Sequence, residues 1–159
     1  MDPQEYVSAL KKVNECGKNA SEKEINIYFL NLKIDFIDCD AKIKSKEDKT
    51  PIGEIDGIFR YGDRFLFLIE TDESSKVDTK KQDSFFSKWS DKTNQEIIMN
   101  RYNLPKNLQP IKIFVCYGES RKSRKDKPSI RHEMKDSTNA ILFKEDVEYF
   151  LKTCELPPD

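Results

Sequence analysis

The sequence has few of the residues on which several common kinds of functional site depend. It contains one histidine, five glycines and four cysteines in 159 residues, and no two cysteines form a Cys-x-x-Cys pair. A structural zinc site needs four closely spaced cysteine and histidine ligands, so we do not expect one. The absence of a glycine-rich phosphate-binding loop argues against a nucleoside triphosphatase. We expect the single histidine, His132, to lie on the surface.

Long apolar runs are also lacking. No segment approaches the length of a membrane span, and no signal-like apolar stretch follows Met1. We therefore expect a cytoplasmic protein with no membrane partner. In that setting we expect the scattered cysteines to be reduced and mostly buried; they are Cys16, Cys39, Cys116 and Cys154. The net charge is only -1, but 36% of the residues are charged, so the charges must form local patches.

Hydrophobic periodicity predicts a single domain over residues 1–159, of class α/β (α+β). The expected core is about residues 21–117, followed by a basic loop at 119–136 and a C-terminal strand and helix at 140–154. A mixed sheet of four to five strands, flanked by helices, accounts for the order of the elements. The expected helices are Asp2–Cys16, a second one opening at Ser21 with Glu24 as a capping box, Lys80–Asn100 and Lys144–Cys154. The expected strands are Phe36–Ala41, Glu54–Tyr61, Arg64–Asp72, Ile111–Tyr117 and Ala140–Phe143.

Acidic residues gather at the ends of the two strands that form the predicted hairpin Gly53–Asp72. The turn falls at Gly62-Asp63, and the second strand delivers Glu70 and Asp72 on one face, because residues two apart in a strand share a face. Antiparallel pairing brings Asp56 of the first strand beside them. Carboxylates that converge at the edge of an apolar core resist ionising, and a hard divalent cation would relieve the repulsion.

These residues resemble the PD-(D/E)xK restriction-endonuclease-like superfamily. The resemblance rests on Glu24 in a helix, Ile-Asp-Gly at Asp56 and Leu-Ile-Glu at Glu70, and it covers about residues 21–117. It implies a restriction-endonuclease-like α-β-β-β-α-β core and a nuclease that hydrolyses phosphodiester bonds of DNA. It also implies Mg²⁺ or Mn²⁺ held by Asp56 and Glu70, with Glu24 as a further ligand and Glu22 as a second choice. The metal would stabilise charge on the phosphate and activate the attacking water.

The sequence departs from the family pattern where the superfamily has its lysine, because Asp72 stands there. In one interpretation Lys80 or Lys81, at the start of the following helix, supplies the missing ammonium group, and Asp72 becomes an extra metal ligand. Lys76 is a weaker alternative. In the other interpretation the site has degenerated, and the fold persists as a nucleic-acid-binding or protein-interaction module.

A basic segment follows the strand at Ile111–Tyr117. Such clusters neutralise phosphates and gain free energy from counterion release, although lysine-rich loops are often only solvated surface. Gln82 resembles a glutamine that some members of the superfamily use to orient substrate. The candidate nucleic-acid contacts are thus Arg121, Lys122, Arg124, Lys125, Lys127 and Gln82.

Three functions are compatible with these patterns. The first is a metal-dependent nuclease acting on DNA, with RNA as the alternative substrate; many such nucleases are dimers, so a homodimer is a further expectation. The second is the catalytically degenerate module. The third is a small scaffold protein whose charges only keep it in solution.

Overall fold

The computed structural model describes residues 2–16, 19–32, 34–76, 79–120 and 138–153. In these ranges the helices are α1 (Pro3–Cys16), α2 (Ala20–Asn31), α3 (Thr79–Ser90), α4 (Lys92–Arg101) and α6 (Lys144–Thr153). The strands are β1 (Asp35–Lys44), β2 (Pro51–Tyr61), β3 (Phe65–Asp72), β4 (Gln109–Cys116) and β5 (Asn139–Leu142). Their types and order agree with the sequence prediction, apart from one long helix that is divided in two.

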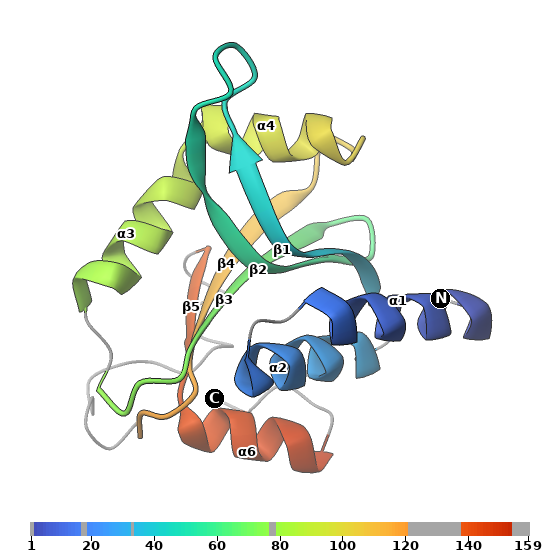
Figure 1. Ribbon diagram of the computed structural model, residues 1–159, viewed down its shortest axis with the longest axis vertical. Helices are drawn as coiled ribbons and strands as arrows, with labels where there is room; N and C mark the ends of the chain where they lie inside the picture. Colours follow the sequence, from blue (N-terminus) through green and yellow to red (C-terminus); the bar gives the residue numbers. More distant parts are fainter. Residues whose placement is uncertain (1, 17–18, 33, 77–78, 121–137, 154–159) are drawn as a thin grey trace.

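The five strands form one mixed sheet in the order β1-β2-β3-β4-β5 (Figure 1). The pairs β1–β2 and β2–β3 are antiparallel, whereas β3–β4 and β4–β5 are parallel. The predicted mixed sheet is therefore confirmed. Gly62 has a φ of 60° in the turn between β2 and β3, which is a conformation that glycine adopts without strain and which supports the predicted hairpin.

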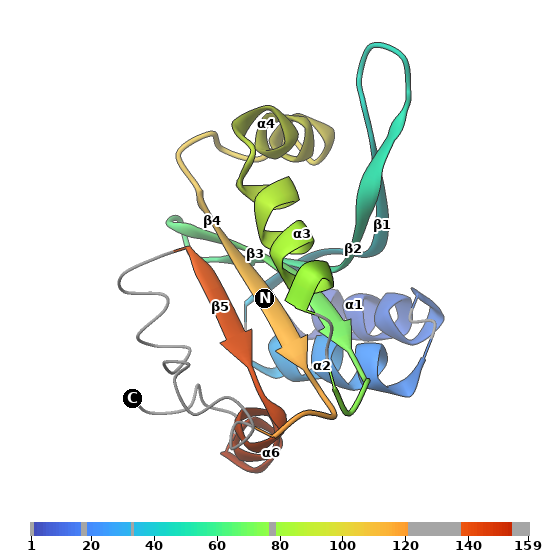
Figure 2. The same cartoon turned by 90° about the vertical axis from the view of Figure 1, so that its left-hand side faces the viewer.

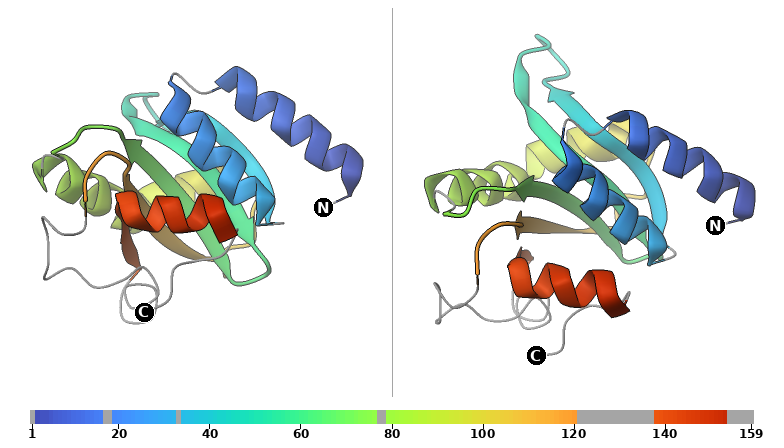
Figure 3. Two further views of the ribbon diagram at one scale, coloured as in Figure 1. Left: turned by 90° about the horizontal axis from the view of Figure 1, so that it is seen from below. Right: turned by 60° about the horizontal axis from the view of Figure 1, so that its bottom comes forward.

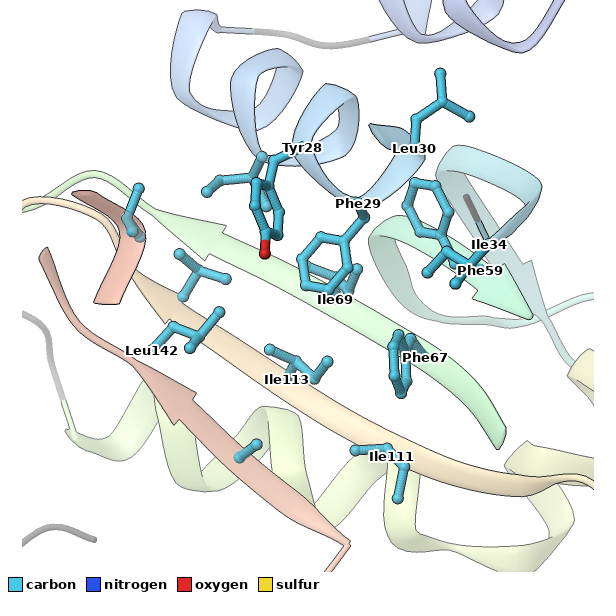
Figure 4. Close-up of a cluster of buried hydrophobic side chains, with 14 of the residues drawn as sticks. Tyr28, Phe29, Leu30, Ile34, Phe59, Phe67, Ile69, Ile111, Ile113 and Leu142 are labelled. Carbon is cyan, nitrogen blue, oxygen red and sulfur yellow. The ribbon is translucent and has the colours of Figure 1, made fainter. Parts of the chain in front are cut away.

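Helices cover both faces of the sheet, and each layer has its own apolar cluster. Figure 3 shows α1, α2 and α6 on one face, with α3 and α4 behind the sheet. In Figure 4 Tyr28 and Phe29 of α2 point toward the sheet, near Ile69 and Ile113. The second cluster is centred on Trp89 and packs α3 and α4 against the other face. Successive residues of β3 alternate between the two clusters, so both faces of the strand are buried, which explains its solid apolar run.

Two predicted helix boundaries were wrong. The predicted helix Lys80–Asn100 is interrupted at Asp91, whose side chain accepts a hydrogen bond from the Asn94 amide and so begins α4 as a new helix. The N-cap of α2 is Asn19 rather than Ser21, and it accepts from the Glu22 amide at 2.9 Å. Glu22, rather than Glu24, therefore occupies the third position of this helix.

The predicted state of two cysteines was also wrong. Cys16, at the end of α1, forms a disulfide with Cys39 of β1, with the two Cα atoms 6.0 Å apart. Cys116 is free and buried, as predicted, whereas Cys154 lies outside the described residues. Disulfides are rare in reducing compartments, so this bond runs against the expected cytoplasmic location, which stays a prediction. Across the part of the chain that the structure describes, no helix has both the length and the apolar character needed to cross a membrane.

Candidate active site

Asp56 and Glu70 lie where β2 and β3 cease to pair. The last paired residues at this end are Gly57 and Ile69, so Asp56 and Glu70 come one step further along each strand. The Thr71 amide donates at 2.8 Å to Asp56 Oδ2, which shows that the Asp56 side chain lies between the two strands. The hairpin therefore places these two acidic residues next to each other, as its predicted register requires.

Burial raises the pKa of Asp56 from 3.8 to about 7, against the opposing effect of the Thr71 hydrogen bond. The charges of Glu22, Glu70 and Glu54 contribute to this rise, and the value of about 7 includes them. Near neutral pH the Asp56 carboxyl is therefore divided between its protonated and ionised forms. A bound cation would favour the ionised form.

Asn26 of α2 holds the backbone next to this carboxyl, and the sequence analysis missed it. Its Nδ2 donates to the backbone carbonyl of Asp56 at 3.0 Å, and its side chain is buried. A Cβ on Gly57 would overlap the Asn26 Oδ1 atom, so α2 can approach β2 this closely only because residue 57 is glycine. The Ile-Asp-Gly motif contained this signal.

Glu70 faces two lysines of α3. Burial raises the pKa of Glu70, while the positive charges of Lys81 and Lys88 oppose that rise. Lys81 and Lys88 are seven residues apart, which corresponds to two helical turns, so they lie on the same side of α3, next to the buried face formed by Gln82, Phe85 and Trp89. The site thus combines buried carboxyl groups with ammonium groups from the neighbouring helix.

Asp72 continues the face of β3 on which Glu70 lies, but its two oxygens already have partners. Oδ1 accepts from the Ser74 amide at 2.9 Å, and Oδ2 accepts from Lys81 Nζ at 3.0 Å. Burial alone would raise the pKa of Asp72, but these hydrogen bonds outweigh it and leave the pKa below its ordinary value. Asp72 therefore positions Lys81, and its predicted role as an extra metal ligand stays a prediction.

Of the two lysines predicted to supply the missing ammonium group, Lys81 is the one that the structure places among the acids. Burial would lower the pKa of Lys81, but its hydrogen bond to Asp72 and the charges of Glu70 and Asp56 raise it overall. Lys81 is consequently a stable cation beside these three carboxyl groups. Lys80 precedes it on α3, and both lysines are exposed, so the ion pair with Asp72 rather than burial distinguishes Lys81.

Glu24, the predicted further ligand, is engaged elsewhere. It accepts a hydrogen bond from the Tyr117 hydroxyl, just beyond β4, and this bond together with burial raises the pKa of Tyr117 to about 12. Glu22 is the α2 glutamate whose charge acts on both Asp56 and Glu70. The second choice from the sequence therefore lies closer to the site than the first.

The four carboxylates predicted as metal ligands are thus not brought together. Among residues 2–16, 19–32, 34–76, 79–120 and 138–153, no group of three or more His, Cys, Asp or Glu side chains is arranged to hold a metal ion. Asp56 and Glu70 remain as a pair of carboxyl groups whose pKa values are raised, mainly by burial. A Mg²⁺ ion needs few protein ligands because it keeps several waters, so these two residues are the ones that could hold it, and the predicted Mg²⁺ site stays a prediction.

The predicted nucleic-acid contacts are divided between buried and undescribed residues. Gln82 is 3% exposed on α3, so its side chain is not displayed on the protein surface. The predicted contacts Arg121, Lys122, Arg124, Lys125 and Lys127, together with His132, lie outside the described residues.

A cationic groove that the sequence analysis missed lies between β1 and α4. It has a volume of about 680 Å³, and four of its six lining residues are cationic, namely Lys42, Lys44, Lys46 and Arg101. The Arg101 guanidinium donates to the backbone carbonyl of Lys42 and so joins α4 to β1. Figure 2 shows the outer part of the β1–β2 hairpin extending beyond the sheet beside α4. Only the fold unites these cations, since Arg101 is far from the three lysines in the sequence.

Comparisons of this chain with protein-family models, curated proteins and solved structures found no match.

Proposed function

We propose that this protein is a divalent-metal-dependent nuclease of the PD-(D/E)xK type that hydrolyses phosphodiester bonds of DNA. The observation that carries the proposal is the position of Lys81. Its ammonium group is 3.0 Å from Asp72, and its charge acts on Glu70 and Asp56, so α3 supplies the cation that position 72 lacks.

In this proposal Asp56 and Glu70 hold Mg²⁺ or Mn²⁺. The bound ion would stabilise the charge that develops on the phosphate and lower the pKa of an attacking water. Lys81 stabilises negative charge on the reacting phosphate, and Asp72 keeps the Lys81 side chain in place. Glu22 adds negative charge that strengthens the attraction of the site for a cation.

The cationic groove supports a polyanionic substrate. Lysine and arginine side chains that neutralise phosphates release counterions, and this release stabilises binding without regard to base sequence. The same groove also favours our second candidate, a module that binds nucleic acid without cleaving it, because the binding of phosphates by lysine and arginine requires no metal. RNA as substrate and a homodimer remain predictions from the family resemblance.

Cleavage assays separate the two candidates. Plasmid DNA, single-stranded DNA and RNA should be incubated with the protein in Mg²⁺, in Mn²⁺ and in EDTA. We expect metal-dependent cleavage that Glu70→Gln abolishes and that Lys81→Met slows by about 100-fold, a typical effect of losing a group that moves protons or stabilises charge. Lys80→Met is the matched control and should retain activity.

The opposite results would favour the module. DNA binding that is unaffected by EDTA and by Glu70→Gln, with no cleavage of any substrate, would rule out the nuclease. Equal losses in Lys80→Met and Lys81→Met would contradict the specific role of Lys81. If the protein neither binds nor cleaves any of the substrates, the result would favour the scaffold protein that we considered from the sequence.

A further inference from the structure

Lys112 is a lysine buried within the sheet layer, and the proposed nuclease site does not use it. It lies on β4 and is 2% exposed. Phe114 and Cys116, which share its face of the strand, belong to the apolar cluster under α3 and α4. Lysine is almost never fully buried unless it is paired, so this position needs a physical explanation.

The ammonium group of Lys112 has only a neutral partner. Its Nζ donates to the Thr138 hydroxyl, immediately before β5, and the Lys112 amide donates to the Thr138 carbonyl at 2.7 Å. No carboxylate of the described residues forms an ion pair with it. Burial lowers the pKa of Lys112, and no charge of the described ranges opposes the shift. Among the residues that the structure describes, the buried amine therefore has no counter-charge.

A pocket lies next to Lys112 and Thr138, between α4 and the start of β4. Its volume is about 440 Å³, within the range of small-ligand sites. Three of its lining residues, Lys92, Lys106 and Lys112, are cationic, and Glu96 is acidic, so the pocket carries an excess of positive charge. It shares no lining residue with the cationic groove or with the acidic site around Asp56.

We propose that this pocket binds a small ligand through a phosphate group, with the buried Lys112 and the half-buried Thr138 as its contacts. A phosphate accepts several hydrogen bonds at once and carries up to two negative charges, so it matches a buried ammonium group, a neighbouring hydroxyl and two further lysines. The ligand would supply a counter-charge that the described part of the fold does not provide. Removing one partner of a buried pair is costly, whereas completing the pair stabilises the folded protein.

Binding can be measured by calorimetry and by thermal unfolding, with inorganic pyrophosphate and a nucleoside monophosphate as probes. EDTA should be present throughout, so that metal-dependent binding at Asp56 and Glu70 does not contribute. We expect both probes, or one of them, to raise the melting temperature of the wild-type protein. Binding of the nucleotide alone would identify a nucleotide as the source of the phosphate.

Lys112→Met is the decisive variant because it keeps the length of the side chain and removes the buried charge. It should fold, since replacing an unpaired buried charge by an apolar group is neutral or stabilising. We expect it to bind at least about tenfold more weakly, which corresponds to about 1.4 kcal/mol. Lys11→Met, an exposed change on α1, is the matched control and should bind like the wild type.

Thr138→Val gives a second test if Lys112→Met fails to fold, because it removes only the hydroxyl that Lys112 contacts. It should also weaken binding. Equal affinity in the wild type and in either pocket variant would overturn the proposal. The proposal would also be overturned if neither probe bound to the wild-type protein.

Discussion

Replacing Asp56 by asparagine should make the protein more stable at pH 8. The carboxyl has a pKa of about 7 in the folded state and an ordinary value of 3.8, so the folded protein holds this proton more tightly than the unfolded chain does. Stability should therefore fall as the pH rises from 3.8 to about 7. At about 1.4 kcal/mol per pH unit, the full loss is about 4 kcal/mol. Asparagine carries no charge and still offers an oxygen to the Thr71 amide, so the variant should avoid this loss.

The assay is urea unfolding of the wild type and of Asp56→Asn at pH 5 and pH 8, in EDTA. The free energy of unfolding of the variant should exceed that of the wild type by more at pH 8 than at pH 5. Asp63→Asn, in the exposed β2–β3 turn, makes the same chemical change and should follow the wild type. Addition of Mg²⁺ at pH 8 should stabilise the wild type but not Asp56→Asn. If both proteins lose the same stability between pH 5 and pH 8, the reasoning about the buried carboxyl is refuted.

Three further perturbations test the fold. Gly57→Ala should destabilise the protein by about 1–3 kcal/mol through overpacking against Asn26, and in the Asn26→Ala background it should cost less; a double-mutant cycle by urea unfolding measures the coupling. Reducing the Cys16–Cys39 bond should cost about 3 kcal/mol, because the cysteines are 23 residues apart; unfolding with and without a reductant checks this, and an unchanged midpoint would contradict it. Trp89→Ala should lower the free energy of unfolding by about 3–5 kcal/mol, because it opens a cavity under α3. Thermal unfolding measures this loss, and an unchanged melting temperature would contradict the tight packing of Trp89.

Elements with a strong local pattern could be predicted from the sequence. The uninterrupted apolar run of β3 and the glycine turn before it determined the hairpin, and with it the proximity of Asp56 and Glu70. The break between α3 and α4 was missed because apolar residues recur at helical spacing on both sides of Asp91. Two residue pairs at the start of α2 are compatible with capping, Asn19 with Glu22 and Ser21 with Glu24. Only the structure shows that Asn19 is the N-cap.

Features that depend on packing between distant segments could not be predicted. The Cys16–Cys39 disulfide requires α1 to lie beside β1, and nothing in the local sequence gives that placement. The Tyr117 hydroxyl that engages Glu24 comes from 93 residues away. Lys81 was one of two candidates because the sequence gave the start of α3 only approximately, whereas the rotation of that helix decides which lysine faces the acids.

The strand order also bears on how the molecule assembles during synthesis. Neighbouring strands in the sheet are neighbours along the chain, and Asp56, Glu70 and Lys81 come from β2, β3 and α3 in direct succession. Contacts between segments close in sequence lose little loop-closure entropy when they form. The acidic hairpin and its lysine can therefore come together while β5 and α6 are still being translated, because these three residues belong to one short, continuous stretch of the chain.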